Sequence, residues 1–395
     1  MTAVPAARRG LVVTIAALAV VTLGGCGSST TSQNAGSTLT LYSLAPLHGP
    51  PAQRSRDIVD GEKLALQQSG GQLGGLSLNF RSADSGKPDG SATPLSAATA
   101  AHSAAQDGSA IGIVGDVGTT ATETAIPLTN AGGDLQVTPA ATYAGLTTSR
   151  GAAVPDQPAR LYPTGRRTFA RVIGSDLTQA PAIVRLARRA GCRSLDVVSG
   201  AAPEERSLAR LVREASGGRA RVVAAANATG ATGATRAPCA FVSVEQPQDA
   251  APLMRALHRA HPAMTLLAPA SLVDPWLARA LGPAAAVTRL LSPVPRLADL
   301  PPAAHRFAAA FHTTFGRAPG PYAFLGYDAM RGIIAAIERA GPRGGDRDAV
   351  VAAFLGHPRP SVLGTASTKT NGDTTLAPWA QARIHHGRIV LGKRV

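Results

Sequence analysis

Apolar runs that predict β-strands alternate with segments of helical periodicity from residue 39 onward. The runs are continuously apolar rather than alternating, as expected for strands of a parallel sheet that helices cover on both faces. This β-α-β alternation predicts a first α/β lobe. The predicted strands are 39–44, 76–80, 111–114 and 135–138, and the predicted helices are 57–68, 92–106 and one that starts near Thr119.

The same alternation restarts after a Pro- and Gly-rich stretch at 143–165 and predicts a second lobe. Residues 225–237 are of low complexity and predict a loop, and His386-Gly387 predicts the turn of a terminal hairpin. The remaining predicted strands are 168–173, 195–199, 222–226, 240–244 and 265–268, and the helices are 180–189, 208–215, 251–259, 275–281, 303–315, 322–340 and 348–355.

The chain is therefore expected to be an α/β protein of two doubly wound lobes with parallel sheets. We place the N-terminal lobe at 38–168 with about 293–341, and the C-terminal lobe at 169–292 with about 342–395. A length of 395 residues and an apolar content of 45% suffice for two cores.

The first 26 residues predict an export signal. Arg8 and Arg9 precede an apolar stretch at 11–22 that is too short to span a bilayer. Leu23-Gly24-Gly25-Cys26 resembles the bacterial lipobox, whose cysteine becomes the lipidated first residue; the alternative is a cysteine placed there by chance. Residues 27–37 are rich in Gly, Ser and Thr and predict a flexible tether. We expect a lipid-anchored protein outside the cytoplasm, on the outer face of the cell membrane.

The formal charge of +15 falls to about +13 when the two signal arginines are removed. The arginines are scattered, and no nucleic-acid motif or interleaved aromatic pattern accompanies them. The composition thus favours a basic surface outside an anionic membrane over a role in binding nucleic acid.

Two further cysteines, Cys192 and Cys239, each precede a predicted strand. In a doubly wound sheet of order 2-1-3 these two strands are neighbours, so the sulfurs can come within bonding distance. Export permits a disulfide. The sequence favours a bridge over two buried thiols.

Candidate ligand chemistry follows two strands of the first lobe. The loop after 111–114 contains two glycines, and the hydroxyls of Thr119 and Thr120 open the next helix. The loop after 135–138 offers Ala140 and Thr142. Ligands of parallel sheets meet these strand ends, where helix N-termini present free N–H groups, so the loops suit a carboxylate. The alternative is that the threonines only cap a helix.

The chain resembles ABC-transporter solute-binding proteins of the branched-chain amino-acid type, which have the type I periplasmic binding fold, and in particular their actinobacterial lipoprotein members. The resemblance covers nearly all of the mature chain through the order and spacing of several short motifs. These are Leu41-Tyr42-Ser43-Leu44-Ala45-Pro46-Leu47-His48-Gly49, Asp57-Ile58-Val59-Asp60-Gly61, Ala104-Ala105-Gln106-Asp107, Val137-Thr138-Pro139-Ala140-Ala141-Thr142-Tyr143, Tyr162-Pro163-Thr164-Gly165, Tyr322-Ala323-Phe324-Leu325-Gly326-Tyr327-Asp328-Ala329-Met330 and Asn371-Gly372-Asp373-Thr374-Thr375.

The resemblance implies that Thr119, Ala140 and Thr142 hold a ligand carboxylate in the cleft between the lobes. It also implies closure of the lobes about crossover strands, and delivery of the solute, an amino acid or related carboxylate, to a membrane permease with its ATPase. The protein is then a monomer without a cofactor.

The second lobe departs from the family pattern. Ala270 stands where amino-acid binders have an acid for the ligand ammonium, and Glu205-Arg206 replaces the usual Tyr-Gly pair. Glu245 follows a predicted strand and either supplies the missing acid or is a solvated loop residue. Arg54 either favours an acidic solute or is an ordinary surface arginine.

No motif of a known enzyme class occurs, and the histidine pairs lack the further acid or cysteine that a metal site requires. The competing function is a ligand-sensing or scaffold protein of the same fold, or a degenerate paralogue that has lost its ligand. The sequence holds no second membrane segment or signalling domain, which favours delivery over signal transduction.

Overall fold

The computed structural model describes residues 1–3, 36–91, 93–224 and 228–395. The predicted signal segment with Cys26, and the predicted tether up to residue 35, lie outside the described residues apart from residues 1–3. Among the described helices, none combines the length and the apolar character that crossing a membrane requires.

The first lobe is built on a sheet of order β2-β3-β1-β4-β5-β6. All neighbouring strands are parallel except β2, which pairs antiparallel with β3. The central strands β1, β4 and β5 are buried almost throughout, as their continuously apolar sequences predict. The strands are β1 Thr38–Ala45, β2 Gln72–Leu73, β3 Leu76–Asp84, β4 Ala110–Val114, β5 Leu135–Thr138 and β6 Phe169–Arg171.

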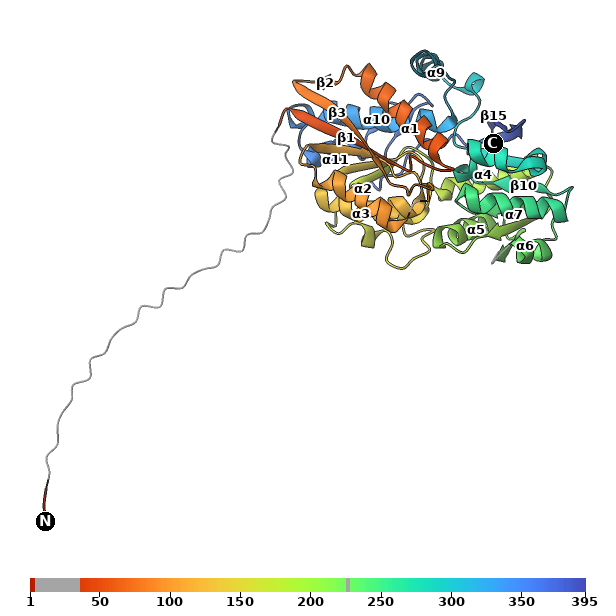
Figure 1. The fold of residues 1–395 in the computed structure, drawn as a ribbon, viewed down its shortest axis with the longest axis horizontal. Coiled ribbons are helices and arrows are strands. Elements are labelled where there is room, and N and C mark those ends of the chain that lie inside the picture. The colour runs from red at the N-terminus through yellow and green to blue at the C-terminus, as the bar shows by residue number, and fades with distance from the viewer. Residues whose placement is uncertain (4–35, 92, 225–227) are drawn as a thin grey trace. The chain divides into compact units, whose positions relative to one another are not determined.

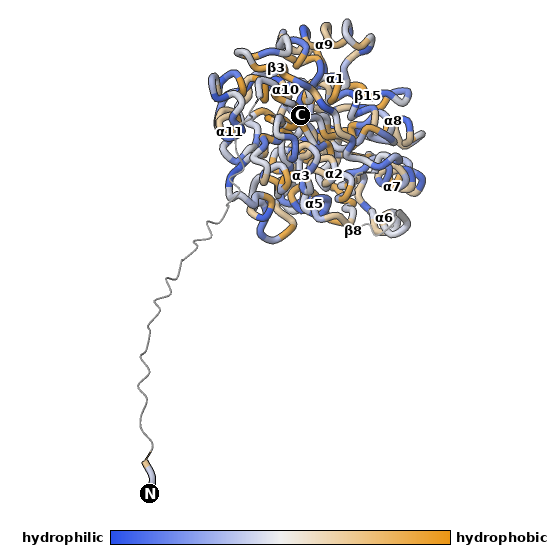
Figure 2. Tube along the Cα trace, turned by 60° about the vertical axis from the view of Figure 1, so that its left-hand side comes forward, coloured by the Kyte–Doolittle hydropathy of each residue, from blue (hydrophilic) through white to orange (hydrophobic). Residues whose placement is uncertain are grey.

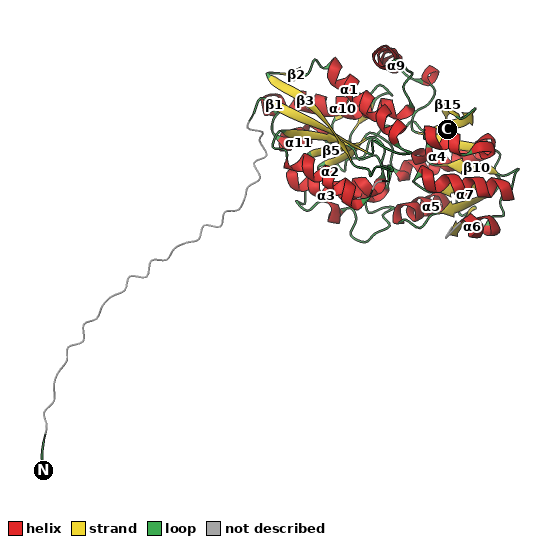
Figure 3. Ribbon diagram, in the orientation of Figure 1, coloured by secondary structure: helices red, strands yellow, loops and turns green. Residues whose placement is uncertain are grey.

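Helices cover both faces of this sheet, with α2 and α3 on one face and α1 and α10 on the other (Figure 3). The backbones of α1 and α10 approach closely at two glycines. A Cβ on Gly61 would lie 2.2 Å from the Ala323 oxygen, and one on Gly326 would lie 2.3 Å from the Ile58 oxygen. The helices are α1 Ala52–Gln68, α2 Pro94–Gln106, α3 Thr119–Gly132, α9 Pro302–Phe315, α10 Pro321–Ala340 and α11 Arg347–Phe354.

The second lobe lies to the right of the first in Figure 1. It is built on a sheet of order β15-β14-β11-β10-β9-β7-β8. The strands from β8 to β11 are parallel, and the terminal hairpin β14–β15 adds two antiparallel strands at one edge. The strands are β7 Leu195–Ser199, β8 Ala220–Ala224, β9 Cys239–Ser243, β10 Thr265–Ala268, β11 Thr288–Ser292, β14 Ala380–His385 and β15 Arg388–Arg394.

The helices of the second lobe follow the same β-α-β alternation. α4 packs against α5, and α7 packs against α6 and α8. In Figure 2 hydrophilic and hydrophobic positions alternate along the helices, as expected for helices with one buried face. The helices are α4 Asp176–Arg189, α5 Pro203–Ala215, α6 Ala228–Ala234, α7 Pro247–Ala260 and α8 Pro275–Ala280.

The prediction of a loop over 225–237 is wrong for α6. This short helix packs against α7, with Ala231 and the adjoining Thr235 fully buried. Its alanines favour a helix, and packing against α7 overcomes the cost of its two glycines. The strand β11 was not predicted from the sequence.

The lobe boundaries differ from those expected at two places. Phe169–Arg171, expected in the second lobe, pairs with β5 as the last strand of the first sheet. The helix α11, also expected in the second lobe, packs against α10, β4 and β5 of the first. Between α11 and β14, Gly372 lies against β6 at φ +93°, where a Cβ would be 2.1 Å from the Phe169 oxygen. Only glycine allows this approach of the two crossover segments.

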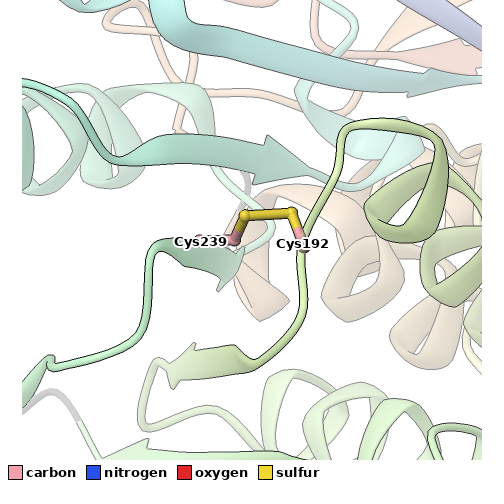
Figure 4. The surroundings of a disulfide bond; sticks show 2 residues. All are labelled: Cys192 and Cys239. Atoms are coloured by element: carbon pink, nitrogen blue, oxygen red, sulfur yellow. A yellow bond between two sulfur atoms is a disulfide. The ribbon is translucent and has the colours of Figure 1, made fainter.

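The predicted disulfide is confirmed: Cys192 and Cys239 are bonded, with their Cα atoms 5.8 Å apart (Figure 4). Cys192 lies just before β7 and Cys239 begins β9. The two strands are direct neighbours in the sheet. The order β8-β7-β9 is the 2-1-3 order that the prediction required.

Candidate functional site

A narrow cavity of about 20 Å³ lies where helix N-termini of both lobes meet. The starts of α3, α4 and α5 contribute to it, as does the end of β9. This is the position at which parallel α/β sheets bind ligands. The lining residues are Thr119, Thr142, Asp176, Gln179, Glu204, Glu205, Leu208, Ser243, Val244, Glu245, Pro269 and Ser271.

Thr119 begins α3 and is 3% exposed. Its N-cap residue, Gly118, has no side chain with which to satisfy the free N–H groups of the first turn. The backbone N–H of Thr119 instead donates a 2.7 Å hydrogen bond to Oε1 of Glu245, which follows β9 in the second lobe. The carboxyl group of Glu245 thus accepts from the Thr119 N–H, the kind of helix-start donor that was predicted to bind a ligand carboxylate.

Thr142 also faces groups of the second lobe. Its hydroxyl accepts a 3.2 Å hydrogen bond from Nε2 of Gln179 and bonds to the carboxyl group of Asp176. The amide N–H of Asp176 donates to the Thr142 carbonyl at 2.8 Å. Oε1 of Gln179 accepts from the N–H of Ala270 at 2.9 Å, so this glutamine joins Thr142 to the loop after β10.

Glu204 and Glu205 stand in the first turn of α5, where a carboxylate interacts favourably with the helix dipole. Glu205 accepts from its own helix start, at the N–H of Ala202 (3.1 Å), and from the N–H of Glu245 (2.9 Å). Oε1 of Glu204 is 3.5 Å from the hydroxyl of Thr120. The Glu204 and Glu245 side chains lie close enough for each to shift the pKa of the other.

The carboxyl groups of the cavity share a rise in pKa. Burial, reinforced by the charge of Glu204, raises the pKa of Glu245 to about 8. Burial raises the pKa of Asp176 to about 6, against the hydrogen bonds from Thr142 and Gln179. Burial likewise raises the pKa of Glu204 and of Glu205. These groups therefore hold protons at a pH where an exposed carboxyl group is ionised.

The structure brings together some of the predicted site residues. Thr119, Thr142 and Glu245 line the cavity, and Thr120 lies beside Glu204. Ala140 is not among the lining residues, and its N–H donates to the hydroxyl of Thr138 at 3.2 Å. Glu245 is not a solvated loop residue, since its carboxyl group meets α3 inside the cavity.

Arg54 is neither a surface residue nor part of the lining. It is 5% exposed, and its Nη1 donates to the carbonyl oxygen of Ser271. Its Nε lies 3.8 Å from Oδ2 of Asp274, and its guanidinium lies over the ring of Tyr322. Arg54 therefore connects α1 of the first lobe to the start of α8 in the second.

Sequence reasoning missed Asp176, Gln179 and Glu204 as lining residues. Two of the three follow the same rule that pointed to Glu245: Asp176 follows β6 and Glu204 follows β7, each in the first turn of a helix. Gln179 lies one turn further along α4 and carries no such signal. Within the described residues, no group of three or more His, Cys, Asp or Glu side chains is arranged to hold a metal ion.

The comparisons with known proteins agree with this architecture. Residues 43–388 match the model of a family described as periplasmic binding protein. The chain belongs to this family of solute-binding proteins, as its resemblance predicted, and its two α/β lobes are the fold expected. The family is in general non-enzymatic and implies a location outside the cytoplasm. No curated protein sequence matches the chain.

Solved structures of branched-chain amino-acid transporter proteins share the fold. The leucine-binding protein LivK from Thermotoga maritima is 18% identical, with a TM-score of 0.76 over 90% of this chain and 98% of its own. LivJ from Streptococcus pneumoniae, in complex with isoleucine, is 15% identical, with a TM-score of 0.74 over 91% and 99%. A solute-binding protein from R. palustris, in complex with benzoate, is 17% identical, with a TM-score of 0.71 over 91% and 97%.

Proposed function

We propose that this protein is the extracytoplasmic, lipid-anchored solute-binding component of an ABC importer. It captures a small solute between its lobes and delivers it to a membrane permease driven by an ATPase. The observation that carries this proposal is the cavity, to which both lobes contribute polar groups at helix N-termini. A solute held there contacts both lobes at once, so its binding favours the closed arrangement.

The polar positions of the first lobe are Thr119 and Thr142. Structures that share this fold are named for complexes with isoleucine and with benzoate, which both carry a carboxylate. The sequence prediction of a carboxylate-bearing solute thus stays one candidate. It requires the solute to displace Glu245 from the N–H of Thr119.

A thermal-shift screen of the purified protein tests solute capture. The panel contains amino acids, small carboxylates, amines, amides and peptides. A solute at one hundred times its dissociation constant stabilises the folded state by about 2.7 kcal/mol, which is readily seen as a rise in Tm. We expect at least one class to raise the Tm of the native protein and to lose this effect in Thr119→Ala and Thr142→Ala.

A control variant at a surface threonine, Thr229→Ala, should respond as the native protein does, because Thr229 is exposed and is not among the cavity residues. If no solute of a broad panel raises the Tm, solute capture is wrong, and a scaffold or a degenerate paralogue becomes the better description. If a solute binds but cells lacking the protein take it up at the normal rate, the protein serves sensing rather than transport.

A further inference from the structure

We infer that the solute presents a positively charged group to this cavity and needs no carboxylate of its own. The inference rests on the proposed function, since it takes the cavity between the lobes as the solute site. It concerns the charge of the solute, which the fold does not determine.

The N–H donor at the start of α3 is already occupied. In a carboxylate site the N–H at the start of α3 must be available to the ligand. Here that N–H donates to Glu245 at 2.7 Å. The backbone N–H of Glu245 is bonded in turn to Glu205, which fixes the start of this side chain. The protein itself therefore supplies the carboxylate that the first lobe is built to receive.

The lining of the cavity is acidic. Four carboxyl groups face the cavity, from Asp176, Glu204, Glu205 and Glu245. Among the described residues that line it there is no Lys, Arg or His. A solute carboxylate would enter beside these acids without a counter-charge, whereas a cation would find several.

The nearest buried arginines are engaged elsewhere. Arg171 lies 3.0 Å from Asp373 and donates to the carbonyl groups of Ala141 and Tyr143. Arg54 is bonded to the Ser271 carbonyl and lies beside Asp274. The charge of Arg171 lowers the pKa of Asp176, so this acid has a partial counter-charge within the chain. The charged groups that shift the pKa of Glu245 are both acids, Glu204 and Glu205, so a counter-charge for Glu245 has to come from a solute.

The pKa shift of Glu245 agrees with a site that favours a cation. Burial and the neighbouring Glu204 raise the pKa of Glu245, and burial also raises that of Glu204. Glu204 acts on Glu245 as a neighbouring negative charge, and a cation bound beside Glu245 would relieve this repulsion. The groups that face Glu245 are Glu204 and Glu205 of α5, Thr119 of α3 and Tyr322 of α10.

The remaining lining favours an organic ammonium ion. Leu208, Val244 and Pro269 give the cavity an apolar side that a short hydrocarbon chain can cover. A primary ammonium group has three donors, which suits several carboxyl groups and the hydroxyl of Ser243. A metal ion is not favoured, because the described residues offer no set of three metal ligands.

Matched probes that differ only in their charged group test the inference. Leucine carries both groups, 3-methylbutylamine carries only its ammonium, and 4-methylpentanoate carries only its carboxylate. Benzylamine and benzoate form a second pair. Binding of each to the native protein is measured by titration calorimetry and by thermal shift. We expect at least one of the two amines to bind, and its carboxylate counterpart to bind at least tenfold more weakly.

The variant Glu245→Gln separates a charge effect from a loss of folding. It should weaken amine binding about tenfold or more, which corresponds to about 1.4 kcal/mol, and should improve binding of the matching carboxylate. A merely structural role for Glu245 would weaken both. The control is Glu214→Gln, an exposed acid at the other end of α5, which should leave both affinities unchanged.

Each other outcome overturns the inference. If a carboxylate binds as well as its amine or better, or if leucine alone binds, the solute needs its own carboxylate, yet solute capture stands. If none of these probes binds but another class of solute in the broad screen does, the cationic solute is wrong and solute capture again stands. If nothing binds in either experiment, both proposals fail.

Discussion

The N–H of Thr119 and the carboxyl group of Glu245, which lie 126 residues apart in the sequence, form a 2.7 Å hydrogen bond between the two lobes. The bond gives a partner to the N–H group at the start of α3. It also holds the carboxyl group of Glu245 in a buried position beside Glu204. Closure of the lobes over an empty cavity is therefore linked to the protonation of Glu245.

The stability of the empty protein should fall as the pH rises from about 4.5 to about 8. Burial raises the pKa of Glu245 from 4.5 to about 8, so the folded protein keeps a proton that the unfolded chain has lost. Stability falls with pH wherever the folded state binds more protons. Glu245→Gln removes this contribution, which is on the order of a few kcal/mol. Urea unfolding of both proteins at several pH values measures the difference.

Other buried acids, such as Asp176, produce a slope of the same sign, so only the difference between the two proteins is informative. Glu214→Gln serves as the control, because this acid is exposed and its removal should leave the slope unchanged. Parallel pH profiles for the native protein and Glu245→Gln would show that the Glu245 carboxyl group is not held protonated.

Removal of the disulfide should destabilise the second lobe by roughly 2–4 kcal/mol. The bridge closes a loop with a sequence separation of 47 residues, and its loss gives the unfolded chain back that freedom. The measurement compares the double variant Cys192→Ser/Cys239→Ser with the native protein by urea unfolding. A reducing agent should lower the Tm of the native protein alone. An equal effect on the double variant would mean that the reagent acts elsewhere.

Lipid attachment at Cys26 is a prediction of the sequence, because this residue lies outside the described part of the chain. In a bacterial host that processes lipoproteins, the native protein should incorporate labelled palmitate and sediment with membranes. Cys26→Ser should abolish the label and release the protein from the membrane fraction. Ser28→Ala provides a neighbouring control. Label that persists in Cys26→Ser would contradict the predicted lipobox.

The elements of the fold were predictable because they depend on local patterns. β5, β7 and β10 have the predicted bounds, since each is a short apolar run ended by a change in polarity. The helix α6 was missed because its alanines and glycines carry no hydrophobic periodicity, and its burial depends on α7. β11 follows a Pro- and Ala-rich segment and likewise lacked a clear start.

The candidate site was only partly predictable, for a related reason. Thr119 and Thr142 follow strand ends, and a strand end locates a residue within its own lobe. The pairing of each carboxyl group with an N–H donor depends on how the two lobes pack together. The spacing of residues in the sequence does not specify this packing. The partners of Glu245 come from a helix start in each lobe, and those of Arg54 follow it by more than 200 residues.

Arg54 should stabilise the closed arrangement of the lobes. Its guanidinium, 5% exposed, bonds the Ser271 carbonyl and accompanies the buried carboxylate of Asp274, which also caps α8. Arg54→Ala leaves that carboxylate without its counter-charge, and loss of one partner of a buried pair costs roughly 3–5 kcal/mol.

Arg54→Lys keeps the charge but not the geometry, so its free energy of unfolding should lie between those of the native protein and Arg54→Ala. Urea unfolding gives the values, with the exposed Arg56→Ala as the control. A decrease of less than about 1 kcal/mol in the free energy of unfolding of Arg54→Ala would mean that water hydrates Asp274 as effectively as the arginine pairs with it. Arg54 would then not hold the lobes together.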